Sequence, residues 1–252
     1  YKIIHVQNID TPMLAGILAK VFLRRKLVAT IHGEVPLYQR SESFWGRLRL
    51  KLMSRMVDRF TAISPENKKQ LQKRGVRSSR IAVIPNGIDT DTFCPPDEEQ
   101  RREARSRLYI PDKAQVVLYQ GRLIDWKRGD LLLDAWAQIK SPNNALLLVV
   151  GAGSESSKLQ KQAKELGIHV RFEGQTNDPL SYLHAADIFV LPSGIRATNT
   201  FEGLSVAIIE ALSTGLAVIA TDCPGNRTLI QNEKNGLLFL AESVDDLVDC
   251  LN

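Results

Sequence analysis

Strand-like and helix-like segments alternate along almost the whole chain, and few folds are compatible with this pattern. Short runs rich in Val, Ile and Leu predict strands at 2–6, 27–31, 59–63, 81–84, 115–120, 146–150, 169–172, 188–191, 217–221 and 237–240. Longer amphipathic runs predict helices, among them 12–26, 44–57 and 65–73. Alternating strands and helices form parallel sheets covered by helices, so the predicted fold class is α/β.

The alternation is interrupted once. The segment 85–87 (PNG) ends the first series, and a polar, charged stretch containing Pro95 and Pro96 continues to Pro111. Such a stretch breaks regular structure and is typical of a connection between domains. We therefore predict a first lobe at 1–90 with four strands, a linker at 91–112 and a second lobe at 113–252 with six strands.

The composition fits a globular protein. With 252 residues, 44% of them hydrophobic, the chain can form two cores. No apolar run approaches the roughly 20 residues of a membrane-spanning helix, and no signal-peptide pattern is visible. The three cysteines, Cys94, Cys223 and Cys250, lack the spacing of a metal site or of a disulfide framework. We therefore expect a cytoplasmic protein with no metal site.

Positive charge is concentrated in the first part of the chain. Residues 1–112 contain 21 Lys and Arg against 12 Asp and Glu, a net charge of +9, whereas residues 113–252 contain 12 against 16, a net charge of −4. Segment 43–60 predicts an amphipathic helix with Arg47, Lys51 and Arg55 on its polar face. It is either an ordinary surface helix or a cationic surface that contacts anionic lipid, at the inner face of the membrane, or an anionic acceptor. No nucleic-acid partner is predicted, because no aromatic-interleaved basic motif is present.

Two carboxylates stand eight residues apart in the apolar segment 201–220. Glu202 comes just before a predicted helix, and Glu210 lies inside it among aliphatic side chains, where an unpaired carboxylate is costly to bury. One interpretation is that Glu202 interacts with the helix dipole and Glu210 forms a salt bridge. The other is that the two acids bind a polyhydroxylated ligand with a phosphate at the helix N-terminus, as in a nucleotide sugar.

Three further loops follow predicted strands, at the sheet edge where ligands bind in such folds. Arg122 and Lys127, in the loop 121–127, either neutralise a diphosphate or lie in a solvated loop. Gly174 either offers backbone groups to a base or forms a plain turn. His32 follows the strand 27–31, where an imidazole can donate to a sugar or phosphate oxygen. The remaining histidines are predicted to be structural: His5, His169 and His184.

The motifs occur in a recognisable order. They are TIHG (30–33), PNGID (85–89), GRLIDWKRGDLLLDA (121–135), VVGAG (149–153), VRFEG (170–174), YLHAADIFVLPS (182–193) and EGLSVAIIEALSTG (202–215). Each motif is weakly or moderately specific, but the set resembles the family 4 retaining glycosyltransferases of GT-B fold along nearly the whole chain. The resemblance implies two Rossmann-like lobes with parallel sheets, the first binding the acceptor and the second binding a nucleotide sugar.

The resemblance also implies roles for residues of the second lobe. Arg122 and Lys127 would bind the diphosphate, and Glu210 would accept hydrogen bonds from the ribose hydroxyls. Glu202 would bond the donor sugar, and the backbone near Gly174 would read the base of a UDP- or GDP-sugar. Backbone amides that open the helix would face sugar and phosphate: those of Gly203, Leu204 and Ser205.

From the first lobe, the resemblance implies that His32 reaches the transferred hexose. Enzymes of this kind generally need no metal or other cofactor, because protein cations take the role of Mg²⁺. Retention would follow from same-face attack by the acceptor hydroxyl on an oxocarbenium-like sugar, with the departing phosphate as the base. The expected acceptor is a lipid-linked or cell-envelope glycan.

The chain departs from the family pattern in three places. No glycine-rich loop precedes Lys2, so we expect an N-terminally truncated, incomplete first lobe whose activity alone is in question. The loop 194–201 is longer than usual and contains Arg196, which leaves the donor sugar open. Leu216 and Ala217 replace a proline-containing turn without consequence for the fold. Two alternatives to a transferase stay open: a GT-B-like sugar-nucleotide epimerase, and a non-catalytic scaffold that binds nucleotide or glycan.

Overall fold

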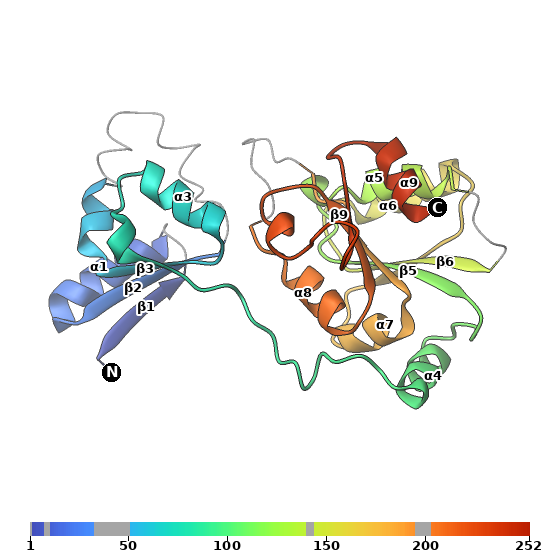
Figure 1. The fold of residues 1–252 in the computed structure, drawn as a ribbon, viewed down its shortest axis with the longest axis horizontal. Helices are drawn as coiled ribbons and strands as arrows, with labels where there is room; N and C mark the ends of the chain where they lie inside the picture. Colours follow the sequence, from blue (N-terminus) through green and yellow to red (C-terminus); the bar gives the residue numbers. More distant parts are fainter. Residues whose placement is uncertain (1, 8–10, 33–50, 140–143, 195–202) are drawn as a thin grey trace. The chain divides into compact units, whose positions relative to one another are not determined.

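The structure is a computed structural model that describes residues 2–7, 11–32, 51–139, 144–194 and 203–252. The chain divides into two compact units, Tyr1–Asn86 with Ala197–Leu204 and Gly87–Arg196 with Ser205–Asn252. Each unit contains one parallel sheet (Figure 1). The predicted α/β fold with four strands followed by six is therefore confirmed.

The first unit is a four-stranded parallel sheet in the order β1-β2-β3-β4. Its strands are β1 (Ile3–Gln7), β2 (Lys26–Ile31), β3 (Arg59–Ala62) and β4 (Ile81–Val83). Helix α1 (Thr11–Leu23) packs on β1 and β2, α3 (Pro65–Lys73) packs on β3 and β4, and residues 51–56 are helical. The rest of the helix predicted at 44–57 lies outside the described residues or at the helix end.

The second unit is a six-stranded parallel sheet in the order β10-β9-β8-β5-β6-β7. Its strands are β5 (Gln115–Gln120), β6 (Ala145–Val150), β7 (Val170–Gly174), β8 (Ile188–Leu191), β9 (Ala217–Thr221) and β10 (Leu237–Phe239). Its helices are α4 (Glu98–Arg107), α5 (Gly129–Trp136), α6 (Ser156–Glu165), α7 (Pro179–Ala185), α8 (Val206–Ser213) and α9 (Val244–Leu251).

Alternate residues of the central strands face two different helix layers. Val116 and Leu118 of β5 belong to a core shared with α4, α7 and α8, whereas Val117 and Tyr119 belong to a core shared with α5, α6 and α9. Strands buried on both faces need continuous apolar runs, which explains why they were predictable. The sheet is thus doubly wound, with helices on both sides (Figure 1).

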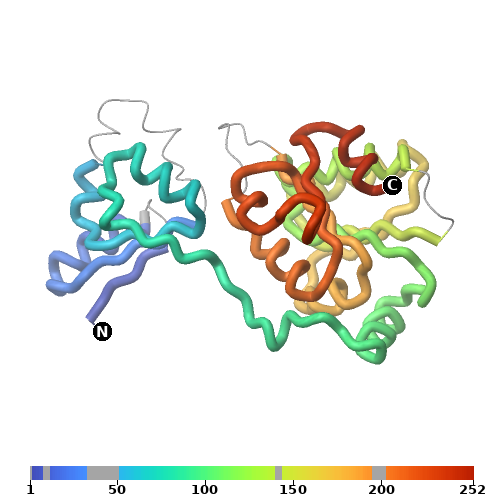
Figure 2. The backbone as a smooth tube through the Cα atoms, in the orientation of Figure 1, coloured from blue at the N-terminus to red at the C-terminus, as the bar shows by residue number. Residues whose placement is uncertain are grey.

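The segment predicted as a linker at 91–112 contains α4, and the structure places it in the second unit. Between β4 and α4 the chain has no helix or strand (Figure 2). Helix α4 begins with a capping box, in which the Asp97 side chain accepts from the Gln100 N–H and Gln100 bonds back to the Asp97 N–H. Its Arg105 is 3% exposed and forms an ion pair of 2.9 Å with Asp187, which precedes β8. The segment is therefore anchored to the second sheet.

Candidate functional site

The strand order of the second sheet reverses between β5 and β8. From β5 the chain proceeds outward to β6 and β7, then returns to β8 and proceeds outward on the other side to β9 and β10. In open α/β sheets, ligands bind beyond the carboxyl ends of the strands at such a switch point. The loops after β5 and β8 therefore define the candidate site, and they contain Arg122, Lys127 and residues 203–205.

The loop after β5 is held in place by the loop after β6. The N–H groups of Gly121 and Leu123 donate to the carbonyls of Val150 and Ala152 at 2.9 and 3.0 Å. A Cβ atom at Gly151, whose φ is +137°, would lie 1.8 Å from the Gly121 carbonyl oxygen. Only glycine allows this approach, so the cationic loop is a fixed part of the sheet edge.

Arg122 and Lys127 lie in different environments within this loop. Lys127 ends the 3₁₀ turn Asp125–Lys127 and is 7% exposed, and its Nζ lies 4.5 Å from the centre of the Trp126 ring. The Arg122 side chain is exposed, and within the described residues it forms no hydrogen bond or ion pair. A nearly buried ammonium and an exposed guanidinium on one fixed loop supply the positive charge that a diphosphate requires.

Arg128, the third cation after β5, has a structural role. Its guanidinium pairs with Asp130 at 3.0 Å and with Glu242. Gly194, in the loop after β8, donates its N–H to the Trp126 carbonyl at 2.8 Å. These contacts join the loops after β5 and β8 to the segment that precedes α9, and they engage the Arg128 guanidinium in ion pairs within the protein.

Glu210 is the fifth residue of α8. Its side chain is half-buried, and no described residue donates to its carboxylate or pairs with it. Burial raises the pKa of Glu210 above its usual value. The salt bridge that was one interpretation of the sequence is therefore absent from the described residues, and a partly desolvated carboxylate suits the binding of vicinal hydroxyls.

The turn before α8 opens the helix without a side-chain cap. Ser205 is the N-cap residue and is 4% exposed, but its hydroxyl forms no capping hydrogen bond in the described part of the chain. Leu204 is also buried, and Gly203 is half-buried. N–H groups at a helix start that lack a cap can bind an anion. The predicted contacts of residues 203–205 with sugar and phosphate agree with this geometry and stay predictions.

Gly174 ends β7, on the other side of β6 from β5. Its φ is +73°, and its carbonyl accepts a hydrogen bond of 2.7 Å from the Gly151 N–H. Apart from Gly174 and its two chain neighbours, no described residue has an atom within 4 Å of the position that a Cβ would occupy. The backbone is therefore open on that side, where reading of a base is a prediction.

Two predicted site residues stand apart from this geometry. Glu202 lies outside the described residues, as does Arg196. His32 directly follows β2 in the first unit, is exposed, and is hydrogen-bonded through Nε2 to Gln7 Oε1 at the end of β1. It thus lies at the carboxyl edge of its own sheet, and its contact with a transferred sugar stays a prediction.

Two polar residues at the end of β5 escape prediction from the sequence. The hydroxyl of Tyr119, which is fully buried, donates to the Arg122 carbonyl at 3.1 Å and so helps to fix the cationic loop. Gln120 is 9% exposed, and its Oε1 has no partner among the described residues. Their position at the end of an otherwise apolar strand was the feature of the sequence from which they could have been predicted.

The second unit is a doubly wound parallel sheet with two cations in a switch-point loop and a partly buried carboxylate on the helix that follows the other loop, an arrangement that suits an anionic ligand with hydroxyl groups. Residues 100–252 match the family of glycosyl transferases group 1, and residues 1–92 match glycosyltransferase family 4. The chain belongs to the glycosyl transferases group 1, and its two Rossmann-like parallel sheets are those of the GT-B fold.

Two relatives are named as a mannosyltransferase and a galactosyltransferase. The chain is 34% identical to a GDP-mannose-dependent alpha-(1-6)-phosphatidylinositol monomannoside mannosyltransferase of Mycobacterium tuberculosis, over 69% of this chain and 46% of that protein. It is 27% identical to UDP-Gal:alpha-D-GlcNAc-diphosphoundecaprenol alpha-1,3-galactosyltransferase of Escherichia coli, over 100% of this chain and 65% of that protein. The chain thus spans about half to two thirds of the length of these relatives.

Solved structures show the same fold. Anabaena HepE in complex with UDP matches with a TM-score of 0.86 and 24% sequence identity, over 99% of this chain and 67% of that one. At this level of identity the likeness concerns the fold.

Proposed function

We propose that this protein is a glycosyltransferase that moves a hexose from a nucleoside-diphosphate sugar to a hydroxyl of a lipid-linked or cell-envelope glycan. The observation that carries the proposal is Glu210, a half-buried carboxylate without a partner among the described residues, on the helix that follows the switch-point loop. Such an acceptor suits ribose hydroxyls, while Arg122 and Lys127 suit a diphosphate. The names of the relatives specify GDP-mannose and UDP-galactose as donors, which favours a transferase over an epimerase or a scaffold.

In the proposed reaction the bond between the anomeric carbon and the diphosphate lengthens, and negative charge accumulates on the leaving group. Arg122, Lys127 and the N-terminus of α8 stabilise this charge. The sugar gains oxocarbenium character, held by Glu202 and approached by His32. The acceptor hydroxyl attacks from the same face and gives its proton to the departing phosphate, so the configuration is retained. Protein cations neutralise the leaving group, and the proposed reaction needs no metal ion.

We also propose peripheral contact with the inner face of a membrane. The two relatives above are named for phosphatidylinositol and diphosphoundecaprenol acceptors, and both are membrane lipids. Among the described residues, no helix has the length and apolar content to cross a membrane. The excess of Lys and Arg in residues 1–112 would attract the protein to anionic lipid.

Calorimetric titration with UDP and GDP tests the site. We expect Arg122→Ala and Glu210→Ala each to weaken binding of the preferred nucleotide by at least about tenfold, because each removes a charge-assisted contact. Matched controls are Lys164→Ala and Glu165→Ala on α6, whose side chains are exposed. Equal affinities for wild type and the two site variants would show that the assignments are wrong.

Transfer itself requires a product assay. Incubation with a panel of nucleotide sugars and lipid-linked acceptors, followed by NMR, should show a new glycosidic bond with the anomeric configuration of the donor. Activity should persist in EDTA. An isomerised nucleotide sugar without a glycosylated acceptor would identify an epimerase, and binding without any turnover would identify a scaffold.

A further inference from the structure

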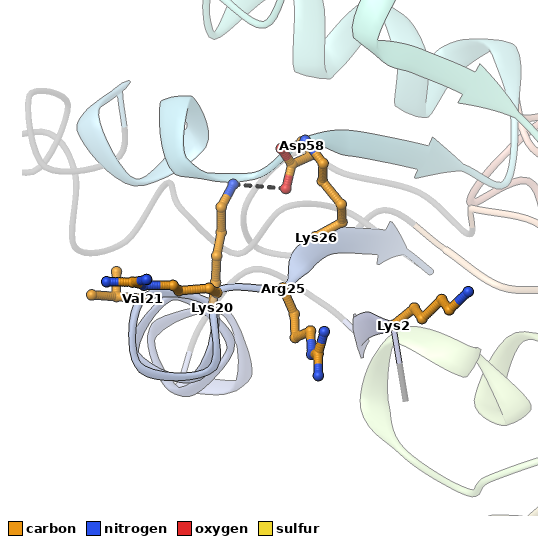
Figure 3. A pocket seen from close by; sticks show the side chains of 7 residues that line it. Lys2, Lys20, Val21, Arg25, Lys26 and Asp58 are labelled. Carbon is orange, nitrogen blue, oxygen red and sulfur yellow. Dashed lines mark hydrogen bonds and ion pairs between the residues drawn. The ribbon is translucent and has the colours of Figure 1, made fainter.

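A basic pocket lies at the amino edge of the first sheet, and the proposed reaction does not use it. The pocket has a volume of about 330 Å³. Five cations and one carboxylate contribute to its lining (Figure 3): Lys2, Lys20, Arg24, Arg25, Lys26 and Asp58. We call it the amino-edge pocket.

Asp58 organises one side of the amino-edge pocket. Its carboxylate accepts hydrogen bonds of 2.7 Å from Lys20 and from the Leu27 N–H, and Lys26 lies 3.7 Å away. Burial by itself raises the pKa of Asp58, but the hydrogen bonds and the neighbouring lysines outweigh burial and hold this pKa below its usual value. Asp58 therefore stays ionised and joins the end of α1 to the starts of β2 and β3.

The other cations of the amino-edge pocket have no such partner. Lys2, Arg24 and Arg25 are exposed, and none of them forms a hydrogen bond or ion pair with a described residue through its side chain. They come from two parts of the chain. Lys2 directly precedes β1, whereas Arg24 and Arg25 lie between α1 and β2 (Figure 3). One carboxylate against five cations leaves a positive excess, which attracts anions to this part of the surface.

The pocket is at the opposite edge of the sheet from His32. Lys2 and Asp58 directly precede β1 and β3, and Lys26 opens β2, whereas His32 follows the carboxyl end of β2. Reactants in α/β sheets bind at the carboxyl edge. The anion for this pocket is therefore a ligand other than the donor.

Apolar side chains flank the pocket along α1. Val21 lines it and is 56% exposed, and Leu18 and Phe22 are 52% and 82% exposed on the same helix. Positions 18, 21 and 22 fall on one helical face. Apolar side chains contribute nothing to the binding of a free phosphate ion. Cations beside exposed Leu, Val and Phe are the combination that binds the interface of an anionic bilayer.

We propose that the amino-edge pocket binds phosphate headgroups of anionic lipids, with Val21 and Phe22 entering the bilayer interface. The inference rests on the proposed membrane contact and specifies its surface. It is independent of nucleotide binding.

Sedimentation with vesicles tests the proposal. The chain should bind vesicles of phosphatidylcholine mixed with phosphatidylglycerol, and bind vesicles of phosphatidylcholine alone far more weakly. The double variant Arg24→Gln/Arg25→Gln should reduce the partition coefficient by about tenfold or more, since each basic residue near the surface contributes about 1 kcal/mol. The control Lys73→Gln/Arg77→Gln removes the same charge from exposed positions near the end of this unit's sequence. It should reduce the logarithm of the partition coefficient by less than half as much.

A second variant tests the apolar part. Phe22→Ser should weaken vesicle binding to the same extent in low and high salt, whereas the loss in the double Arg variant should disappear in high salt. Equal losses in the two double variants would overturn the proposal in favour of a diffuse charge effect. NMR titration with inorganic phosphate tests whether the ligand is a soluble phosphate instead. Phosphate-induced shifts at the amides of residues 20–26, together with unchanged vesicle binding in the variants, would overturn the proposal in favour of a soluble phosphate ligand.

Nucleotide calorimetry separates the two proposals. Unchanged nucleotide affinity in a variant that no longer binds vesicles supports the amino-edge pocket as the membrane surface. Vesicle binding that persists in all of these variants overturns the proposal that the amino-edge pocket binds lipid. The proposed reaction, and membrane contact through another surface, would then still stand.

Discussion

Replacing Glu210 by Gln should change stability and nucleotide binding in opposite directions. Burial raises the pKa of Glu210, and among the described residues nothing compensates its charge. Because the folded pKa lies above the unfolded one, the ionised group destabilises the fold, and this penalty grows as the pH rises from below the unfolded pKa to above the folded pKa. Gln is neutral and nearly isosteric. We expect Glu210→Gln to stabilise the free protein at pH 7 by about 0.5–2 kcal/mol, with a rise in Tm of roughly 2–4 °C per kcal/mol.

The same substitution should weaken nucleotide binding. A hydrogen bond to a charged group contributes about 1.5–3 kcal/mol, against about 0.5–1.5 kcal/mol for a neutral one. In the proposed complex two ribose hydroxyls donate to the Glu210 carboxylate. Each of these hydrogen bonds would lose about 1 kcal/mol when a neutral amide replaces the carboxylate, which raises Kd roughly tenfold to thirtyfold.

The assay combines urea denaturation between pH 4 and pH 8 with calorimetric titration of UDP or GDP. The stability difference between Glu210→Gln and wild type should be largest at neutral pH and shrink toward pH 4, as the carboxyl becomes mostly protonated in both states. Glu165 is an exposed carboxylate on α6 that pairs with Lys161, and the control Glu165→Gln should lower stability by at most about 0.5 kcal/mol and leave nucleotide affinity unchanged. A variant that is less stable than wild type at pH 7, or a difference independent of pH, would refute the reasoning, because it would mean that the carboxylate is satisfied in the free protein.

Three further predictions concern the second unit. Gly151→Ala should prevent it from folding, because the added Cβ meets a facing carbonyl oxygen at 1.8 Å, whereas Gly167→Ala, at φ +66° with open space around it, should cost only about 1–2 kcal/mol in denaturation experiments. Arg105→Ala should cost about 2–3 kcal/mol because it removes a buried guanidinium that donates to the carbonyls of Ala185, Asp112 and Ala114, while Asp187 keeps its pairing with Arg101; Arg102→Ala, exposed on the same helix, should stay within about 0.5 kcal/mol. Burial lowers the pKa of His184, so wild type should lose stability as the pH falls below about 6.5, and His184→Gln should flatten the stability curve in that range.

The strands were predictable because buried strands appear in the sequence as short, continuous apolar runs. Strand β5 was predicted at 115–120, where the structure has it, since strands covered on both faces need uninterrupted apolar runs. Helix α4 was not predicted, because its sequence EEQRREARSR is almost entirely polar. The contacts that hold it, such as the pairing of Arg101 and Arg105 with Asp187, join residues more than 80 positions apart.

The position of the candidate site was predictable, but the ion pairing of its charged side chains was not. Loops that follow strands could be assigned to the ligand-binding edge from their order alone, and this applies to Arg122 and Lys127. The absence of a partner for Glu210 among the described residues depends on which side chains surround α8, and no local pattern encodes that. The use of Arg128 in structural ion pairs likewise depends on Glu242, which is more than 100 residues away.

The attachment of the segment before β5 bears on how this protein should be divided for expression. The Phe93 carbonyl accepts a hydrogen bond from Ser213, the Cys94 carbonyl from His184 at 3.2 Å, and Phe93 packs against the core of the second sheet. A fragment that starts at residue 113 would strip this cover from α7 and α8 and expose apolar surface, so it should be poorly soluble. A fragment that starts at residue 87 keeps this cover, so the proposed nucleotide binding can be tested on it without the first sheet.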